Sequence, residues 1–235
     1  MSGTLYLVGV GPGDPELLTL KAARVLRHIA VVAYPATADG GTFALDIAGT
    51  HVNPAAVRFP VTIPMSIERA PAQAAYDAAA ADIVAHLDAG RDVAWLCEGD
   101  PLFYGSAMYL THRVAAQASV TVIPGVTSLT AAAAVIARPL AARNELLKVL
   151  PAPLPDETLR TELLATPAAA IIKVGRHFDR VRRLLTETGH ATGAIVVEHA
   201  TTGRQRITPL AAFAHDERPY FSTILCYRGA EAWGR

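Results

Sequence analysis

Short apolar runs alternate along this chain with longer amphipathic stretches, which predicts an α/β fold. Each run of about six residues ends in a turn signal, after which apolar residues return at helical spacing. The opening unit, strand 4–10, helix 14–27 and strand 29–34, predicts parallel strands joined by a right-handed crossover. Further strands are predicted at 57–59, 92–97, 120–123, 146–150, 169–174, 194–198, 204–208 and 220–227, and further helices at 43–48, 67–87, 108–118, 129–136, 157–165, 178–187 and 209–215.

The repetition of this pattern predicts two α/β domains, residues 1–123 and 124–235. A chain of 235 residues is long enough for a sizeable core in each of them. A cleft between two such domains is the natural place for a ligand.

The composition narrows the class of protein. Hydrophobic residues make up 51% of the chain and charged residues 18%, which is typical of a globular protein. Lys+Arg and Asp+Glu both number 21, so wholesale binding of nucleic acid is not expected. We expect neither a signal peptide nor a membrane span. Cys97 and Cys226 lack metal-ligand spacing, so we predict buried free thiols in a reducing cytoplasm and no metal site.

The chain is organised around the stretch Gly99–Ser106, which follows the buried strand 92–97 and leads into a helix. In a parallel sheet, the loop after a strand's carboxyl end is where ligands bind. Gly99 would let a ligand approach the backbone, and Asp100 would offer a carboxylate to a hydroxyl or an amine. A plain turn is the competing interpretation.

Two more loops follow strands in the same way. Gly9–Asp14 is rich in glycine, but it lacks the Gly-Lys-Ser/Thr of a phosphate loop and the spacing of a dinucleotide fingerprint. Pro124–Ser128 leads into the helix at 129–136, where Thr127 and Ser128 could cap the helix, face a cleft, or do both.

Cationic residues stand near several strand ends in the second half. Lys173 lies in the predicted strand 169–174, where it could bind an acidic substrate or extend to the surface. A plausible basic set for a polycarboxylate consists of Arg143, Arg176, His177, Arg204 and Arg206, although surface arginines are the default interpretation.

Four motifs in order resemble the tetrapyrrole (corrin/porphyrin) methyltransferase family, over nearly the full chain. They are Gly9–Thr19, Glu98–Pro101 with Tyr104–Ser106, Ile123–Ser128, and Val197–Arg206. Within the family, three segments look most like the enzymes that methylate C20 of precorrin-2 in cobalamin biosynthesis, namely Ala33–Pro35, Val149–Ala152 and Pro219–Thr223.

The resemblance implies a parallel N-terminal sheet, a mixed C-terminal sheet, S-adenosylmethionine as methyl donor, and a homodimer. Precorrin-2 or cobalt-factor II would be the substrate. The implied cofactor contacts are Pro12, Glu98, Gly99, Asp100, Phe103, Thr127, Ser128, Val174, Ala200 and Thr223. Related members often have glycine at position 98, which puts a side-chain role for Glu98 in doubt. Tyr104 or Lys173 would steer a proton, and Arg143, Arg204 and Arg206 would bind substrate carboxylates.

Two other hypotheses remain open from the residues alone. One is methylation of a different ring position of a precorrin. The other is a nucleotide-binding module without catalysis, which only the Gly9–Gly13 loop supports.

Overall fold

The computed structural model describes residues 2–37, 40–64, 69–214 and 220–229. The chain forms two compact units that divide between Thr127 and Ser128. The first unit contains β1 (Thr4–Gly9), α1 (Leu20–His28), β2 (Val31–Ala36), α2 (Phe43–Ala48), β3 (Val57–Thr62), α3 (Arg69–Asp88), β4 (Val93–Cys97), α4 (Met108–Val114) and β5 (Ser119–Ile123).

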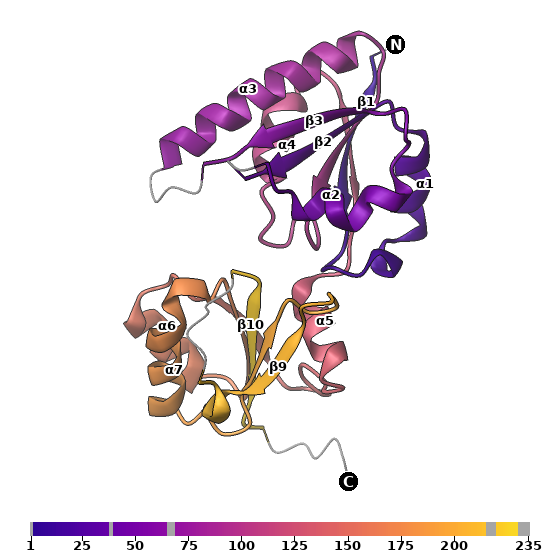
Figure 1. Cartoon of the computed structure of the whole chain (residues 1–235). Coiled ribbons are helices and arrows are strands. Elements are labelled where there is room, and N and C mark those ends of the chain that lie inside the picture. The colour runs from indigo at the N-terminus through magenta and orange to yellow at the C-terminus, as the bar shows by residue number, and fades with distance from the viewer. Residues whose placement is uncertain (1, 38–39, 65–68, 215–219, 230–235) are drawn as a thin grey trace. The chain divides into compact units, whose positions relative to one another are not determined.

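The sheet of the first unit is parallel throughout, with the strand order β3-β2-β4-β1-β5 (Figure 1). Strand β1 pairs with β4 on one side and with β5 on the other, so that Leu7 lies opposite both Trp95 and Val122. The carboxyl ends of β1, β4 and β5 therefore meet at one edge of the sheet.

Helices cover both faces of this sheet. On one face, α3 and α4 pack against Leu7, Val93 and Trp95. On the other face, α1 and α2 pack against Ala94 and Leu96. Every residue of β4 is buried, which explains why this strand reads as a continuous apolar run in the sequence. Among the described residues, no helix is both long and apolar enough to cross a membrane.

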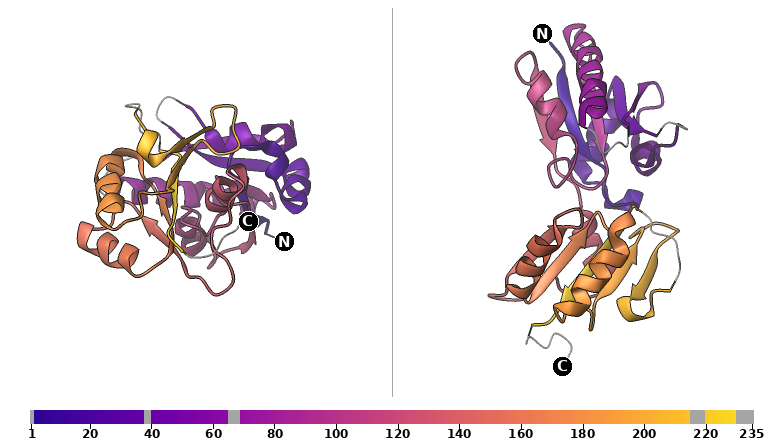
Figure 2. Two further views of the ribbon diagram at one scale, coloured as in Figure 1. Left: turned by 90° about the horizontal axis from the view of Figure 1, so that it is seen from below. Right: turned by 90° about the vertical axis from the view of Figure 1, so that its left-hand side faces the viewer.

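The second unit has a mixed sheet, as the resemblance implied. Its elements are α5 (Ser128–Val135), β6 (Leu147–Pro151), α6 (Asp156–Leu164), β7 (Ala168–Ile172), α7 (Phe178–Glu187), β8 (Ile195–Glu198), β9 (Arg206–Pro209) and β10 (Ser222–Tyr227). The strand order is β6-β7-β10-β8-β9, and β10 runs antiparallel to both of its neighbours. Helices α6 and α7 pack on one face of this sheet (Figure 2).

Several predicted elements differ in extent. The helix predicted at 14–27 is a 3₁₀ turn at Pro15–Leu17 followed by α1, because Leu18 is extended and the Thr19 side chain caps α1 by accepting from the Ala22 N–H at 3.2 Å. Strand β2 continues through Pro35 to Ala36, beyond the predicted stop. A proline is tolerated there because the pairing with β4 has already ended at Ala33, so the missing N–H leaves no bond to β4 unmade.

Other boundaries shift less. The helix predicted at 108–118 ends as α4 at Val114, and the helix predicted at 209–215 is a 3₁₀ turn, Leu210–Ala212. The predicted start of the long helix at residue 67, like the predicted end at residue 215, lies outside the described residues.

Candidate functional site

The chain changes direction across the first sheet between the neighbouring strands β1 and β4. Strand β1 leads to α1 on one face, and β4 leads to α4 on the opposite face. The connections after these two strands therefore diverge. In open α/β sheets, ligands bind at this kind of switch point, beyond the carboxyl ends of the strands. The structure thus places the glycine loops after β1 and β4 at the position where a ligand is expected.

Three loops join here through their main chains. Gly11 and Gly99 exchange hydrogen bonds, with N···O distances of 3.2 Å and 2.7 Å. A Cβ atom on Gly9 would lie 2.6 Å from the Gly125 nitrogen, and one on Gly125 would lie 2.1 Å from the Gly99 oxygen. No other residue type fits at such distances, so glycine is required for this backbone-to-backbone packing.

Asp100 holds two of these loops together. Its Oδ1 accepts from the N–H of Leu102 at 2.9 Å and from that of Phe103 at 3.1 Å, which closes the turn after β4. Its Oδ2 accepts from the Gly125 N–H at 3.0 Å, in the loop after β5. Sequence reasoning offered this carboxylate to a ligand, but the structure directs it to three main-chain donors of its own unit.

Glu98 lies between the end of β4 and Gly99, and its side chain is half-buried. Burial raises the pKa of Glu98 above the ordinary value of a glutamic acid, while its own N–H and that of Ala44 act in the opposite direction. Burial also raises the pKa of Cys97 well above the usual thiol value, with the charge of Glu98 adding to the effect. A raised pKa enlarges the neutral fraction of Glu98, which can donate a hydrogen bond as well as accept one.

Both cysteines are buried and free, which confirms the prediction of buried free thiols. Within the described ranges, no group of three or more His, Cys, Asp or Glu side chains could hold a metal ion.

The remaining predicted residues of the first unit lie on the same loops. Phe103 and Tyr104 make an edge-to-face ring contact with centroids 5.2 Å apart. Tyr104 is exposed and has a φ of 56°, a left-handed conformation that is strained for a bulky residue. Pro12 is buried in the loop after β1, and Thr127 is half-buried at the end of the unit.

The second unit brings a further set of predicted residues to one edge of its own sheet. Because β10 is antiparallel to β7 and β8, the carboxyl ends of β7 and β8 flank the start of β10. Val174 follows β7, Ala200 follows β8, and Thr223 lies in β10. Val174 and Thr223 are buried, whereas Ser128, the first residue of α5, is exposed.

The sequence pattern predicted that Lys173 lies inside a buried strand, and this prediction is wrong. Strand β7 ends at Ile172, and Lys173 is exposed in the following connection with a φ of 57°. His199 and Thr201 adopt φ values of 47° and 68° in the connection after β8. Left-handed backbone conformations are uncommon for residues other than glycine. Three of them, at Lys173, His199 and Thr201, lie at this edge of the second sheet, and Tyr104 has one in the first unit.

Arg206 has a partner that sequence reasoning did not foresee. Its Nε lies 3.4 Å from Oε2 of Glu198, and the Glu198 side chain is completely buried. A buried carboxylate requires a countercharge, so this arginine has a structural task beside its predicted role with substrate. The β8–β9 register places Glu198 directly opposite Arg206, so pairing the two predicted strands as a hairpin would have found the contact.

The structure separates the other two predicted substrate arginines. Arg204 is exposed in the connection between β8 and β9. Arg143 lies in the turn before β6, where Glu145 accepts a hydrogen bond from the hydroxyl of Tyr227 at the far end of β10. Arg143 is therefore at the opposite edge of the sheet from Arg204.

Comparison with known proteins shows the family to which this chain belongs. A family model described as "Tetrapyrrole (Corrin/Porphyrin) Methylases" matches residues 4–213. The solved structure of uroporphyrin-III C-methyltransferase from Thermus thermophilus, complexed with S-adenosyl homocysteine, is 27% identical with a TM-score of 0.69, and the match covers 95% of this chain and 97% of that one.

Curated relatives are closer in sequence. The cobalamin biosynthesis protein CobIJ of Mycobacterium tuberculosis is 42% identical over 95% of this chain, which spans only 46% of that protein. The precorrin-2 C(20)-methyltransferase of a Sinorhizobium species is 40% identical over 95% of this chain and 94% of its own length. The cobalt-precorrin-2 C(20)-methyltransferase of Salmonella typhimurium is 31% identical over 96% of both.

Proposed function

Because the chain belongs to the tetrapyrrole (corrin/porphyrin) methylases, we propose that it methylates C20 of precorrin-2 with S-adenosylmethionine, in cobalamin biosynthesis. The observation that carries this proposal is the 40% identity to the Sinorhizobium enzyme over nearly the full length of both chains. Since identity to the enzyme named for the cobalt-containing substrate is 31%, we favour metal-free precorrin-2 over cobalt-factor II.

The loops at the first switch point fit a methyl donor that carries both polar and apolar parts. The glycines at positions 9 and 125 let the three loops pack main chain against main chain, which holds the ends of the loops close together. Phe103 supplies a half-exposed aromatic ring, and Glu98 supplies a carboxyl group. We assign S-adenosylmethionine contacts in both units. They are Pro12, Glu98, Gly99, Asp100, Phe103 and Thr127 in the first unit, where Asp100 also shapes the loop, and Ser128, Val174, Ala200 and Thr223 in the second.

Bound S-adenosylmethionine supplies a methyl group on a sulfonium sulfur, which is a good leaving group. The substrate's meso carbon is electron-rich and behaves like the carbon of an enamine, so it needs little activation by a base. The protein's main contribution is then to hold the reacting carbon in line and to exclude water. Tyr104 or Lys173 would take up or relay the proton that the methylated carbon loses.

We further propose a homodimer that works in the cytoplasm, on a small-molecule substrate and without nucleic acid or membrane. The balanced charge of the chain supports the absence of a nucleic-acid partner. Size-exclusion chromatography with light scattering would test the dimer directly.

The decisive experiment is an anaerobic incubation of the protein with S-adenosylmethionine and either precorrin-2 or cobalt-factor II. Mass spectrometry should show a gain of one methyl group on precorrin-2, and NMR of the product should place that group at C20. A methyl group at another carbon would assign the chain to a different ring position. No gain on either substrate, with S-adenosylmethionine still bound, would exclude both proposed substrates.

A further inference from the structure

Two aromatic residues occupy the middle of the sheet edge at which β7 and β8 end. Tyr220 and Phe221 directly precede β10, which lies between those two strands. The Cα of Tyr220 lies 4.0 Å from the position of a Cβ on Gly175, in the connection after β7. The Phe221 carbonyl accepts from the His199 N–H at 2.9 Å, in the connection after β8. The aromatic pair therefore spans the distance between the two connections.

Both rings are accessible. Tyr220 is 54% exposed and Phe221 is 38% exposed, although neighbouring residues of β10 are buried. The two rings meet edge to face with centroids 5.3 Å apart, and the ring of Phe221 lies 6.1 Å from that of His199. Exposed aromatic rings that gather at one place mark a contact surface more often than isolated apolar side chains do.

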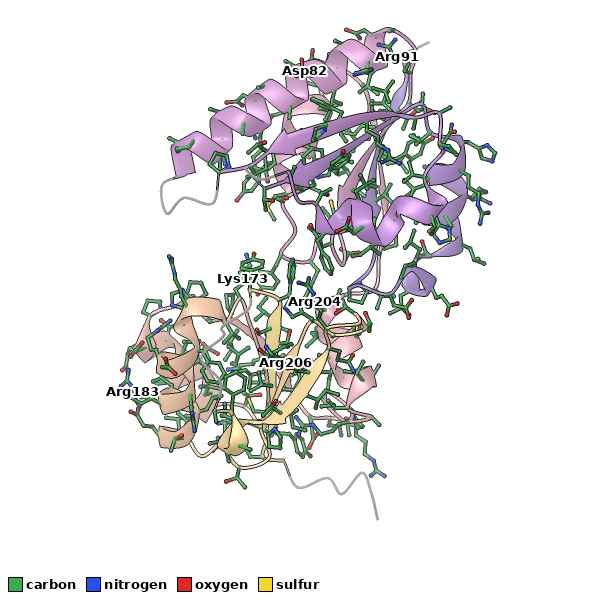
Figure 3. All side chains as sticks on the ribbon, in the orientation of Figure 1. Asp82, Arg91, Lys173, Arg183, Arg204 and Arg206 are labelled. Atoms are coloured by element: carbon green, nitrogen blue, oxygen red, sulfur yellow. The ribbon has the colours of Figure 1, made fainter. Side chains whose placement is uncertain are left out.

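Cationic side chains stand on both sides of these rings. Lys173 and Arg176 are exposed in the connection after β7, and Arg204 is exposed in the connection after β8. Figure 3 shows Lys173 and Arg204 at the same end of this sheet, whereas Arg183 lies away from it on α7. The pKa of His177 is lowered by burial and then by the charges of Arg180 and Arg176, which agrees with a positive potential on the β7 side.

We propose that this edge binds the tetrapyrrole substrate, with Tyr220 and Phe221 against the apolar face of the macrocycle and Lys173, Arg176 and Arg204 on its carboxylates. The inference rests on the proposed function, and it adds two residues to the predicted substrate contacts, namely Tyr220 and Phe221. A flat apolar ring with carboxylates on its rim complements aromatic side chains that have cations on two sides. Arginine is particularly suited to carboxylates because its planar fork bonds both oxygens.

The test removes single charges from the two sides of the edge. Arg176→Gln and Arg204→Gln should each raise the Michaelis constant for precorrin-2 by about tenfold, as expected for one lost charge-assisted hydrogen bond. Tyr220→Leu should also raise it. Affinity for S-adenosylmethionine, measured by calorimetry, should stay as in the wild type. The matched control is Arg183→Gln, which removes the same charge from α7, where the side chain is 55% exposed. If the edge variants behave like this control, the proposal is wrong.

A second measurement separates this inference from the proposed reaction. Uroporphyrin, a polycarboxylate porphyrin, can be titrated against each variant by fluorescence, even if the wild-type protein methylates neither substrate. Uroporphyrin should bind the wild type and the Arg183→Gln variant alike, and it should bind the Arg176→Gln and Arg204→Gln variants more weakly. Mesoporphyrin, which carries fewer carboxylates, should discriminate less.

The same edge could instead face a second copy of this chain. Sedimentation of the Tyr220→Leu variant tests that alternative. Dissociation into monomers with uroporphyrin binding unchanged would overturn the proposal, because the surface would then be an interface between copies. An unchanged oligomeric state with weaker uroporphyrin binding supports the proposal.

Discussion

Asp100→Asn separates the two tasks of the Asp100 carboxylate. The amide oxygen of asparagine can still accept from the N–H groups of Leu102 and Phe103, so the turn after β4 can close. The amide nitrogen then faces the N–H of Gly125, where a donor meets a donor. The variant therefore breaks the link between the loops after β4 and β5 without removing the turn.

The size of the effect follows from that one contact. A hydrogen bond to a charged acceptor contributes about 1.5–3 kcal/mol. Asp100 is half-exposed, so water recovers part of the loss and the lower end of that range applies. We expect S-adenosylmethionine affinity to fall about tenfold, which corresponds to about 1.4 kcal/mol, because fewer molecules hold the loops in the binding arrangement.

Calorimetric titration of S-adenosylmethionine measures this loss, and thermal unfolding reports stability beside it. Asp92→Ala is the control, since it removes the Oδ1 atom that accepts from the Thr4 N–H at 2.7 Å at the opposite edge of the same sheet. It should lower stability to a similar extent and leave cofactor affinity unchanged. Wild-type affinity in a folded Asp100→Asn variant would refute the reasoning, and so would an equal loss of affinity in both variants.

Further predictions concern stability. Gly125→Ala should lower the melting temperature of the protein, because its Cβ would lie 2.1 Å from the Gly99 oxygen and overpacking costs about 1–3 kcal/mol or more; differential scanning calorimetry measures this, and a wild-type transition would contradict the packing described. Burial lowers the pKa of His190 below 6.5, so the unfolded chain binds its proton first and stability should decline as pH falls below that value. Urea unfolding across this pH range should show the decline, and His190→Gln should flatten it. Arg138→Gln should reduce stability by about 1–3 kcal/mol in urea unfolding, because the guanidinium donates to two main-chain carbonyls, whereas Arg183→Gln should have little effect.

The order and type of the elements were accessible from the sequence because local patterns determine them. The side chains of the apolar run 92–97 are buried on both faces of a sheet. A strand in that position is apolar throughout and does not alternate, which is why a short continuous apolar run predicted it. The break at Thr19 was missed because a threonine inside an amphipathic stretch gives no sign that it caps a second helix.

What the sequence could not supply was the partner of each polar group. The link from Asp100 to the loop after β5 was not foreseen, because its donor, the N–H of Gly125, is 25 residues away and is brought near only by the pairing of β1 with β4 and β5. For Arg206, a hairpin of the two predicted strands gives the pairing with Glu198, but the complete burial of that carboxylate is a property of the assembled sheet. Arg143 joined the predicted basic set by residue type alone, without regard to which edge of the sheet it occupies.

The position of β10 has a consequence for the order in which the protein is made. Strand β10 is the last strand of the described chain, yet it lies at the centre of the second sheet and separates β6-β7 from β8-β9. During synthesis, the first unit is complete while the second unit still lacks β10, the strand that joins its two halves. The second unit must therefore assemble late, through contacts distant in sequence, which is the slow kind of folding. Until then its two strand pairs present open edges, so this half of the chain is the more open to wrong strand pairing during synthesis.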